Sequence, residues 1–250
     1  MSYLAESYER FMVPSLFEPW SFHLIQRANL QLGERVLDIA CGTGIVARNV
    51  VPRVGSQGMV VGLDVNPDMI GMAQAMAERQ RLPNENFDLV FCQFGLMFFS
   101  NQHAALKEMH RVLKTGGRVV LGVWQGLDRH PFYQTLHEVS QRHLGKSSVQ
   151  AVFSLGSSDD LHKLLTDSGF QHVEIEPLLL TAHFPNPEEF LAWEIDVDSA
   201  ETPALQNLDI KAQQVILAAV RQDMERQLED VMQDKQVVLQ FHAHIAEARE

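Results

Sequence analysis

The stretch RVLDIACGTGIVAR, residues 35–48, predicts a short buried strand that passes through a glycine turn into a helix. Residues 42–47 within it fit the pattern G-x-G-x-x-G/A, whose glycines let a nucleotide-type ligand approach the backbone closely. The pattern alone does not identify the ligand, because NAD and other cofactors that contain a nucleoside use such a turn. The residues around the turn separate these cases.

Two acidic residues flank this turn. Asp38 lies at the end of the first strand, where a carboxylate would oppose the charge of a pyrophosphate. It suits a cationic ligand that has many donors, such as S-adenosylmethionine, which carries a sulfonium, an ammonium and no phosphate. Asp64 ends the second expected strand, where a carboxylate can accept hydrogen bonds from both hydroxyls of a ribose. Either acid could instead cap a helix, Asp64 being placed to cap the one that starts near Pro67.

Strand-like and helix-like segments alternate from residue 33 to residue 125. This order predicts an α/β fold, a doubly wound, Rossmann-like and mostly parallel sheet, in which ligands lie at the carboxyl ends of the strands. The expected strands are 35–40, 58–65, 87–94 and 118–124, and the expected helices are 42–51, a segment from Pro67, and 101–114.

The composition excludes several classes of protein. A net charge of -12 argues against a general nucleic-acid binder and against electrostatic attachment to anionic membranes. Two cysteines, Cys41 and Cys92, are too few for a secreted disulfide scaffold, and no stretch reaches the roughly 18 apolar residues of a spanning helix. We therefore expect a cytoplasmic protein. The pair His242 and His244 lacks further ligands at suitable spacing, so no metal site is expected.

Four motifs in order resemble those of the class I S-adenosylmethionine-dependent methyltransferases. They are VLDIACGTG, VVGLDVNPDMI, FDLVFCQFGLMFF and EMHRVLKTGGRVVLGVW. The resemblance is to the branch that includes ubiquinone- and menaquinone-biosynthesis methyltransferases. It covers residues 33–125 and extends more loosely to residues 3–32 and to LLTDSGFQHVEIE. It implies S-adenosylmethionine as the cofactor and a small-molecule methyl acceptor, which would be a quinol, a lipid-like compound or another secondary metabolite.

The resemblance also implies roles for individual residues. Each of these residues matches a family position that contacts one part of the cofactor or folds over it. Asp38, Ala40, Gly42 and Gly44 match the first motif, Asp64 the acid on the ribose hydroxyls, Val65 and Met69 the residues that flank the adenine, Gln93 the residue whose backbone meets the methionyl amino group, and Tyr3 and Tyr8 an aromatic region that folds over the cofactor.

Acceptor-side residues are less well marked. His130 and Tyr133 follow the last expected strand of the core, and Trp124 ends it. We expect these three to contact the acceptor. His130 is also the only candidate for a base, which methyl transfer requires only where the acceptor must lose a proton. A surface-loop histidine is the alternative.

One departure from the family lies between residues 80 and 87, where a strand and an adenine-contacting acidic turn are missing. The missing strand would lie at the edge of the sheet, so the fold could survive its loss, whereas the adenine pocket could not be intact. The alternatives are a shortened protein without activity that binds or scaffolds, a loop absent from the sequence, or another segment that covers the adenine. An NAD-dependent oxidoreductase is a further alternative, against which Asp38 argues.

The domain organisation follows from these assignments. We expect a methyltransferase domain at residues 1–185, made of a helical cap at 1–32, the core at 33–125 and acceptor-side elements at 126–185, followed by a helical C-terminal extension at 186–250. Within the cap, Pro14 and Pro19 are expected to break the helix into pieces. The helical extension could pair two copies into a homodimer.

Overall fold

The computed structural model describes residues 3–74, 87–200, 205 and 208–250, without the side chains of residues 3, 4 and 71–74. The chain forms two compact units. The first consists of Met1–Gln125, Leu155–Leu178 and Ala243–Glu250, and the second of Gly126–Ser154 and Leu179–His242. Each unit is described by itself below.

A mixed sheet organises the chain, with the strand order β2-β1-β3-β4-β7-β5 and a short β6 paired to β7. The pairs of β1 with β2, β1 with β3 and β3 with β4 are parallel, whereas β4 and β7 are antiparallel. This confirms the expected α/β class with a mostly parallel sheet. The strands are β1 Arg35–Ile39, β2 Met59–Leu63, β3 Phe87–Gln93, β4 Leu113–Trp124, β5 Gln171–Phe184, β6 Met232–Gln233 and β7 Gln236–Arg249.

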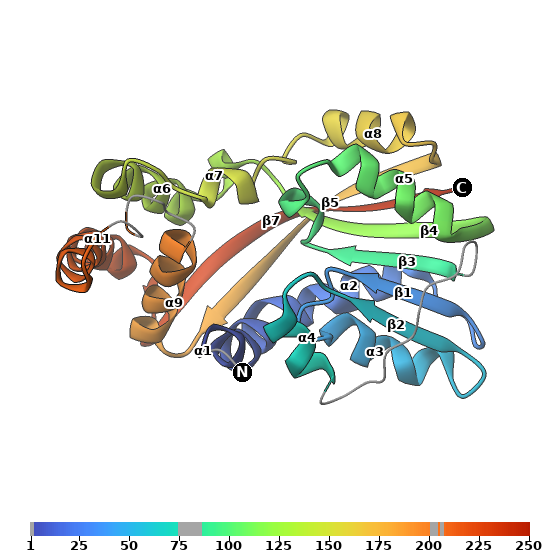
Figure 1. The fold of residues 1–250 in the computed structure, drawn as a ribbon, viewed down its shortest axis with the longest axis horizontal. Coiled ribbons are helices and arrows are strands. Elements are labelled where there is room, and N and C mark those ends of the chain that lie inside the picture. Colours follow the sequence, from blue (N-terminus) through green and yellow to red (C-terminus); the bar gives the residue numbers. More distant parts are fainter. Residues whose placement is uncertain (1–2, 75–86, 201–204, 206–207) are drawn as a thin grey trace. The chain divides into compact units, whose positions relative to one another are not determined.

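Helices of the first unit cover both faces of this sheet (Figure 1). The connection from β1 to β2 runs through α3, and the connection from β3 to β4 runs in the opposite direction through α5, so right-handed crossovers put these helices on opposite faces. The helices are α1 Tyr3–Ser7, η1 Tyr8–Phe17, α2 Glu18–Ala28, α3 Ile45–Val54, α4 Pro67–Gln74, η2 Leu96–Phe98, α5 Gln102–Val112 and α8 Ser158–Asp167.

Burial explains why the central strands are nearly continuous apolar runs. Leu89–Cys92 of β3 and Val119–Leu121 of β4 are fully buried, as expected where helices cover both faces. By contrast, β2 pairs only with β1 among the described strands and is partly exposed along its length. The core of the first unit therefore lies around β1, β3 and β4.

The N-terminal segment stays helical from Tyr3 to Ala28, so the expected breaks at its prolines do not occur. Pro14 lies inside the π-helix η1, and Pro19 lies in the first turn of α2, where a missing backbone N–H is tolerated. The wider π-helical spacing is visible where the N–H of Glu18 donates to the carbonyl of Val13, five residues earlier.

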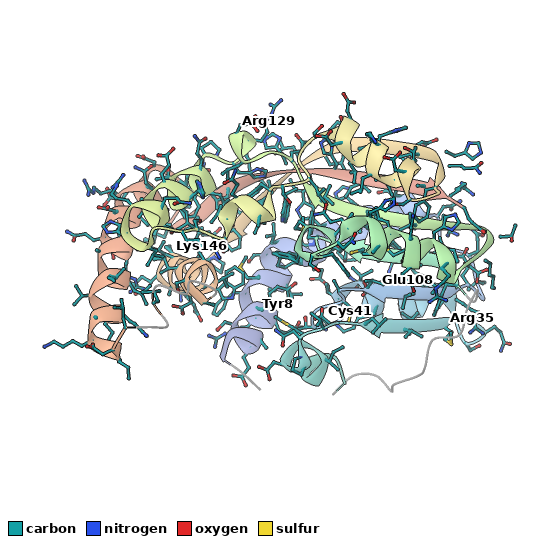
Figure 2. All side chains as sticks on the ribbon, turned by 45° about the horizontal axis from the view of Figure 1, so that its top comes forward. Tyr8, Arg35, Cys41, Glu108, Arg129 and Lys146 are labelled. Carbon is teal, nitrogen blue, oxygen red and sulfur yellow. The ribbon has the colours of Figure 1, made fainter. Side chains whose placement is uncertain are left out.

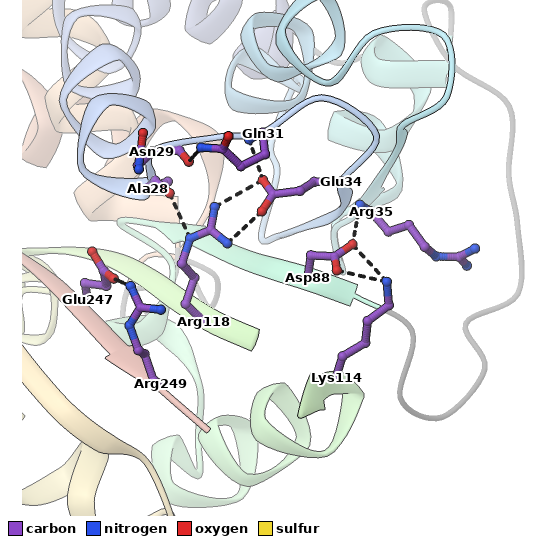
Figure 3. A network of polar contacts seen from close by, with 10 residues as sticks. All are labelled: Ala28, Asn29, Gln31, Glu34, Arg35, Asp88, Lys114, Arg118, Glu247 and Arg249. Atoms are coloured by element: carbon purple, nitrogen blue, oxygen red, sulfur yellow. Dashed lines mark hydrogen bonds and ion pairs between the residues drawn. The ribbon is translucent and has the colours of Figure 1, made fainter. Parts of the chain in front are cut away.

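A charged network ties the N-terminal helices to the ends of the strands opposite the glycine turn (Figure 3). Arg118 of β4 donates to both carboxylate oxygens of Glu34, at 2.9 and 3.1 Å, and to the carbonyl of Ala28 at 2.8 Å. Close by, Asp88 accepts hydrogen bonds from the backbone of Arg35 and from Lys114. The side chain of Arg118 is only 11% exposed, so this bidentate ion pair is well shielded from water.

The chain after residue 231 corrects the expectation of a helical extension at 186–250. Residues 236–249 form β7, which lies between β4 and β5 in the sheet. The division at residue 185 is not followed either, because β5 and β7 each contribute residues to both units. Pro177 does not interrupt β5, which is the last strand in the sheet order, and an edge strand tolerates a missing N–H.

The second unit is mainly helical. Its helices are η3 Leu127–Arg129, α6 Pro131–Leu144, α7 Val149–Val152, α9 Pro187–Ala200 and α11 Ile210–Asp230. Its interior is rich in aromatic rings, among them Phe184, Phe190 and Phe241. In the described part of the chain, no helix is long and apolar enough to cross a membrane.

Candidate functional site

The glycine turn after β1 uses the left-handed backbone region three times in five residues. The φ angles are 54° at Ala40, 54° at Gly42 and 88° at Gly44, and α3 begins at the next residue. Two of these positions cost little because they are glycines, whereas Ala40 carries a side chain in this region. The turn is closed by a hydrogen bond of 2.8 Å from the N–H of Gly44 to the carbonyl of Cys41. A strained backbone is held in place here.

Asp64 accepts backbone hydrogen bonds with both of its carboxylate oxygens, one of them from the glycine turn. One oxygen accepts from the N–H of Gly42 at 2.8 Å and the other from the N–H of Asn66 at 2.9 Å. The cap of α4 is Asn66, whose side chain accepts from the N–H of Asp68. Asp64 therefore connects the end of β2 to the glycine turn and is not the helix cap considered as its alternative role.

Asp38 is buried beside the turn and only half satisfied. One of its oxygens accepts from the N–H of Ala47 in the first turn of α3, at 3.1 Å, so it does cap this helix. The other oxygen, Oδ1, is buried and has no hydrogen-bond partner in the described structure. Burial raises the pKa of Asp38 to about 7, with a further contribution from the charge of Asp64, while the bond from Ala47 acts in the opposite direction.

Tyr8 lies over the glycine turn (Figure 2). A Cβ atom on Gly42 would be 3.5 Å from the Tyr8 hydroxyl, so the ring packs where the missing side chain would point. Burial and the nearby carboxylate of Asp64 raise the pKa of Tyr8 well above its usual range. The next residue, Glu9, forms an ion pair of 2.8 Å with Arg48, which also donates to a carbonyl of the turn.

The end of β3 meets this turn directly. A Cβ atom on Gly95 would lie 2.4 Å from the Cβ of Ala40, so only glycine allows this approach. Gln93, the last residue of β3, donates from Nε2 to the carbonyl of Phe17 at 3.0 Å. Phe94, between them, is a second residue with a side chain in the left-handed region, at φ 51°.

Aromatic rings gather behind Phe94. Its ring stacks on that of Trp124 with 3.7 Å between centroids and an angle of 4°, and both rings meet the edge of Trp20. Phe17 links this group to Tyr8, on which it stacks at 5.0 Å. The rings thus follow the carboxyl ends of β3 and β4 to the glycine turn.

The residues expected around the adenine are more exposed than those of the glycine turn. Val65 is 99% exposed, and Met69 is partly buried on α4. The missing strand and acidic turn were placed between residues 80 and 87, and of these 80–86 lie outside the described residues.

His130 belongs to the second unit, and the hydrogen bonds of its ring argue against the expected role as a base. Its Nε2 accepts from the N–H of His242 at 3.1 Å, and its Nδ1 lies 3.1 Å from the carbonyl of Gly126. Both ring nitrogens are therefore engaged by the backbone, which requires the proton on Nδ1. Burial lowers the pKa of His130 to about 4, so the ring is neutral. Its two hydrogen bonds connect the backbone at Gly126 with the backbone at His242.

Tyr133 also lies in the second unit, where it donates to Glu194 at 2.7 Å. Glu194 and Asp198 are buried carboxyl groups that the sequence analysis missed. They lie on α9 in one stripe with Phe190 and Ile195, so two acidic residues on an apolar helix face were the available signal. Burial raises the pKa of Glu194 to about 8, whereas Asp198 accepts hydrogen bonds from residues 147–149.

The donors and acceptors of the first unit fit S-adenosylmethionine. The glycine turn offers backbone that a Cβ would otherwise cover, and Asp38 presents a buried acceptor without a donor, which suits an ammonium or sulfonium cation. Among the described residues, no group of three or more His, Cys, Asp or Glu side chains could hold a metal ion.

Comparison with known proteins identifies the fold and the family. Residues 37–121, which contain the glycine turn and Asp64, match the methyltransferase domain family. The ubiquinone/menaquinone biosynthesis C-methyltransferase UbiE of Neisseria meningitidis serogroup B is 31% identical over 189 residues, which cover 65% of this chain and 77% of that protein. UbiE of Coxiella burnetii is 39% identical over 118 residues, which cover 41% of this chain and 47% of that protein. The chain thus spans about half the length of the latter relative.

A solved structure gives the same fold. Phosphoethanolamine N-methyltransferase 2 of Haemonchus contortus, solved with S-adenosylhomocysteine, matches with a TM-score of 0.52 and 18% identity over 92% of this chain and 52% of that one. The fold and the glycine turn together are those of a class I methyltransferase. The chain belongs to the S-adenosylmethionine-dependent methyltransferases, in the branch of the ubiquinone- and menaquinone-biosynthesis enzymes.

The comparisons also bear on the alternatives. They give no support to a scaffold protein that lacks methyl transfer or to an NAD-dependent oxidoreductase. The alignment with UbiE of Coxiella burnetii has a length of 118 positions, which would be 47% of the 250 residues of this chain. The matched part is only 41% of this chain, so the relative has residues in this alignment that this chain lacks.

Proposed function

We propose that this chain transfers a methyl group from S-adenosylmethionine to a small-molecule acceptor and that the site at the glycine turn holds the cofactor. The observation that carries the proposal is the pairing of Asp38 and Asp64 around the turn. Asp38 offers a buried acceptor without a donor, and Asp64 lies at the end of the neighbouring strand. Two carboxylates favour a cationic ligand with ribose hydroxyls over a dinucleotide pyrophosphate.

The residues of the first unit would share the work of holding the cofactor. Its methionine part would lie along the turn from Asp38 through Ala40, Gly42 and Gly44, and the backbone of Gln93 would meet its amino group. Asp64 would exchange its backbone hydrogen bonds for bonds from the ribose hydroxyls. We further propose that Val65 and Met69 flank the adenine and that Tyr8 covers the cofactor from the side of the N-terminal helices.

Methyl transfer asks little acid–base chemistry of the protein. When bound, S-adenosylmethionine supplies an electrophilic methyl group whose leaving group is a neutral thioether. The chain has to align the acceptor and exclude water, and buried aromatic rings such as Trp124 and Phe94 are suited to this. An activated carbon of a quinol ring needs less help from a base than a hydroxyl does.

The acceptor is the finer part of the proposal. The branch of the family and the aromatic residues favour a quinol or another flat, lipid-like molecule. Contacts of Trp124 in the first unit and Tyr133 in the second with the acceptor stay predictions. His130 is proposed only to shape the second unit, because its ring nitrogens are engaged by the backbone.

Calorimetric titration of the purified chain with S-adenosylhomocysteine tests this function, with NADH as the control ligand. Binding of S-adenosylhomocysteine alone, with a micromolar dissociation constant, is the expected result. Binding of NADH alone, or of neither ligand by a folded chain, would contradict it. The acceptor is then sought by incubating the chain with S-adenosylmethionine and quinols that differ in the length of the prenyl tail.

A further inference from the structure

The side chain of Gln93 is engaged at one end only. Its Nε2 donates to the carbonyl of Phe17, the last residue of η1, at 3.0 Å. Its Oε1 is buried and accepts no hydrogen bond from any described residue. The amide cannot be turned round, because that would place two oxygen atoms 3.0 Å apart. The unused atom is therefore an acceptor.

A second unused acceptor lies on the same face of the sheet. Asp38 is aligned with Phe91 in the pairing of β1 and β3, and Gln93 follows Phe91 by two residues. Side chains alternate along a strand, so Gln93 and Asp38 share one face at the carboxyl ends of neighbouring strands. The buried Oδ1 of Asp38 also lacks a partner. Two unsatisfied buried acceptors are costly in a folded protein and call for a donor-bearing ligand.

The segment that Gln93 holds also reaches the glycine turn at its other end. Tyr8, the first residue of η1, packs on Gly42, and Glu9 forms an ion pair with Arg48. Gln93 fastens Phe17 at the last residue of the same segment. A π-helix of ten residues is far longer than the single turns in which this geometry is usually found, and such turns are frequent at functional sites.

We propose that Gln93 is a positioning residue that couples cofactor binding to the ordering of the Tyr8–Phe17 segment through the two ends of one amide. The inference rests on the proposed function. The cofactor ammonium donates to Oε1 of Gln93, and this bond fixes the amide so that Nε2 holds Phe17 in place. The bound cofactor thereby strengthens the cover that η1 forms over the site, and exchange in this segment is faster without it.

Two substitutions separate the two ends of the amide. Gln93→Glu keeps an acceptor oxygen for the ammonium and loses the donor to Phe17. Gln93→Leu has a similar size and loses both. Gln141→Glu, on an exposed part of α6 in the second unit, makes the same change of charge as the first variant and serves as its control. Circular dichroism establishes that each variant is folded.

The experiment combines calorimetry with hydrogen–deuterium exchange of residues 8–17, each with and without S-adenosylhomocysteine. In the wild type and in Gln141→Glu, the ligand is expected to slow exchange in this segment. Gln93→Glu is expected to bind the ligand within a few-fold of wild type but to show no slowing of exchange. Gln93→Leu is expected to bind about tenfold more weakly or worse, as for the loss of a hydrogen bond to a charged group.

The outcomes distinguish this inference from the function on which it rests. If the wild type binds and Gln93→Glu shows the same slowing of exchange, the coupling is refuted while the function stands. Unchanged affinity in a folded Gln93→Leu variant refutes the bond to the ammonium. A wild type that does not bind S-adenosylhomocysteine overturns the proposed function and the coupling together.

Discussion

Replacing Glu194 by Gln is expected to remove a large part of the stability that the buried carboxyl groups of this protein lose as the pH rises from 5 to 9. The carboxyl group is buried on α9 and accepts a hydrogen bond from Tyr133 at 2.7 Å. A glutamine keeps an oxygen for that bond and cannot ionise. The substitution therefore removes the titration and keeps the contact.

The magnitude follows from the shift in pKa. Burial is the largest cause that raises the pKa of Glu194 from 4.5 to about 8, and the charge of Asp198 adds to it. Between these pH values the folded protein keeps a proton that the unfolded chain has released, so the free energy of unfolding falls as the pH rises. The contribution is complete below pH 4.5 and lost above about pH 8. At about 1.4 kcal/mol for each pH unit, it amounts to about 5 kcal/mol.

Urea unfolding followed by circular dichroism, at about pH 5, 7 and 9, measures the effect. Asp38 contributes in the same direction because its pKa is raised to about 7, so the variant retains a part of the dependence. Glu188→Gln, on an exposed position of the same helix, makes the same chemical change and is expected to follow the wild type. An equal fall in stability for Glu194→Gln and wild type would mean that Glu194 is already ionised in the folded protein.

Four further predictions concern the first unit. Asp64→Ala is expected to weaken binding of S-adenosylhomocysteine by about 1–3 kcal/mol in calorimetry, and unchanged binding would remove Asp64 from the site. Gly95→Ala places a Cβ 2.4 Å from that of Ala40 and is expected to cost about 1–3 kcal/mol of stability and to weaken binding. Gly116→Ala, where φ is 76° but the space is open, is expected to cost about 1 kcal/mol in thermal unfolding and to bind normally. Arg118→Met is expected to cost about 3 kcal/mol, because it leaves a shielded carboxylate without its partner; a loss too small to measure would refute this.

The parallel half of the sheet could be predicted because local signals agree there. The apolar runs of β1, β3 and β4 and the glycines after β1 all lie where the sequence placed them. Asp38, Gly42 and Asp64 could be brought together because parallel strands end on one edge.

The C-terminal strand was missed for a physical reason. The helical extension was expected to continue to residue 250, although Val237, Leu239 and Phe241 recur at every second residue, which is the period of a strand. Long-range pairing with β4 decides this segment. The role of His130 could not be derived either, because its partner His242 is remote in sequence.

The position of β7 has a consequence for how the chain is made. β4 ends at Trp124, whereas its antiparallel neighbour begins at Gln236. During synthesis, the edge of β4 that pairs with β7 therefore keeps unpaired N–H and C=O groups until the ribosome has translated the whole second unit. Such an edge invites pairing with another nascent chain. We therefore expect chaperones to bind the growing polypeptide and the isolated protein to refold slowly, because the strand that completes the sheet beside β4 is made last.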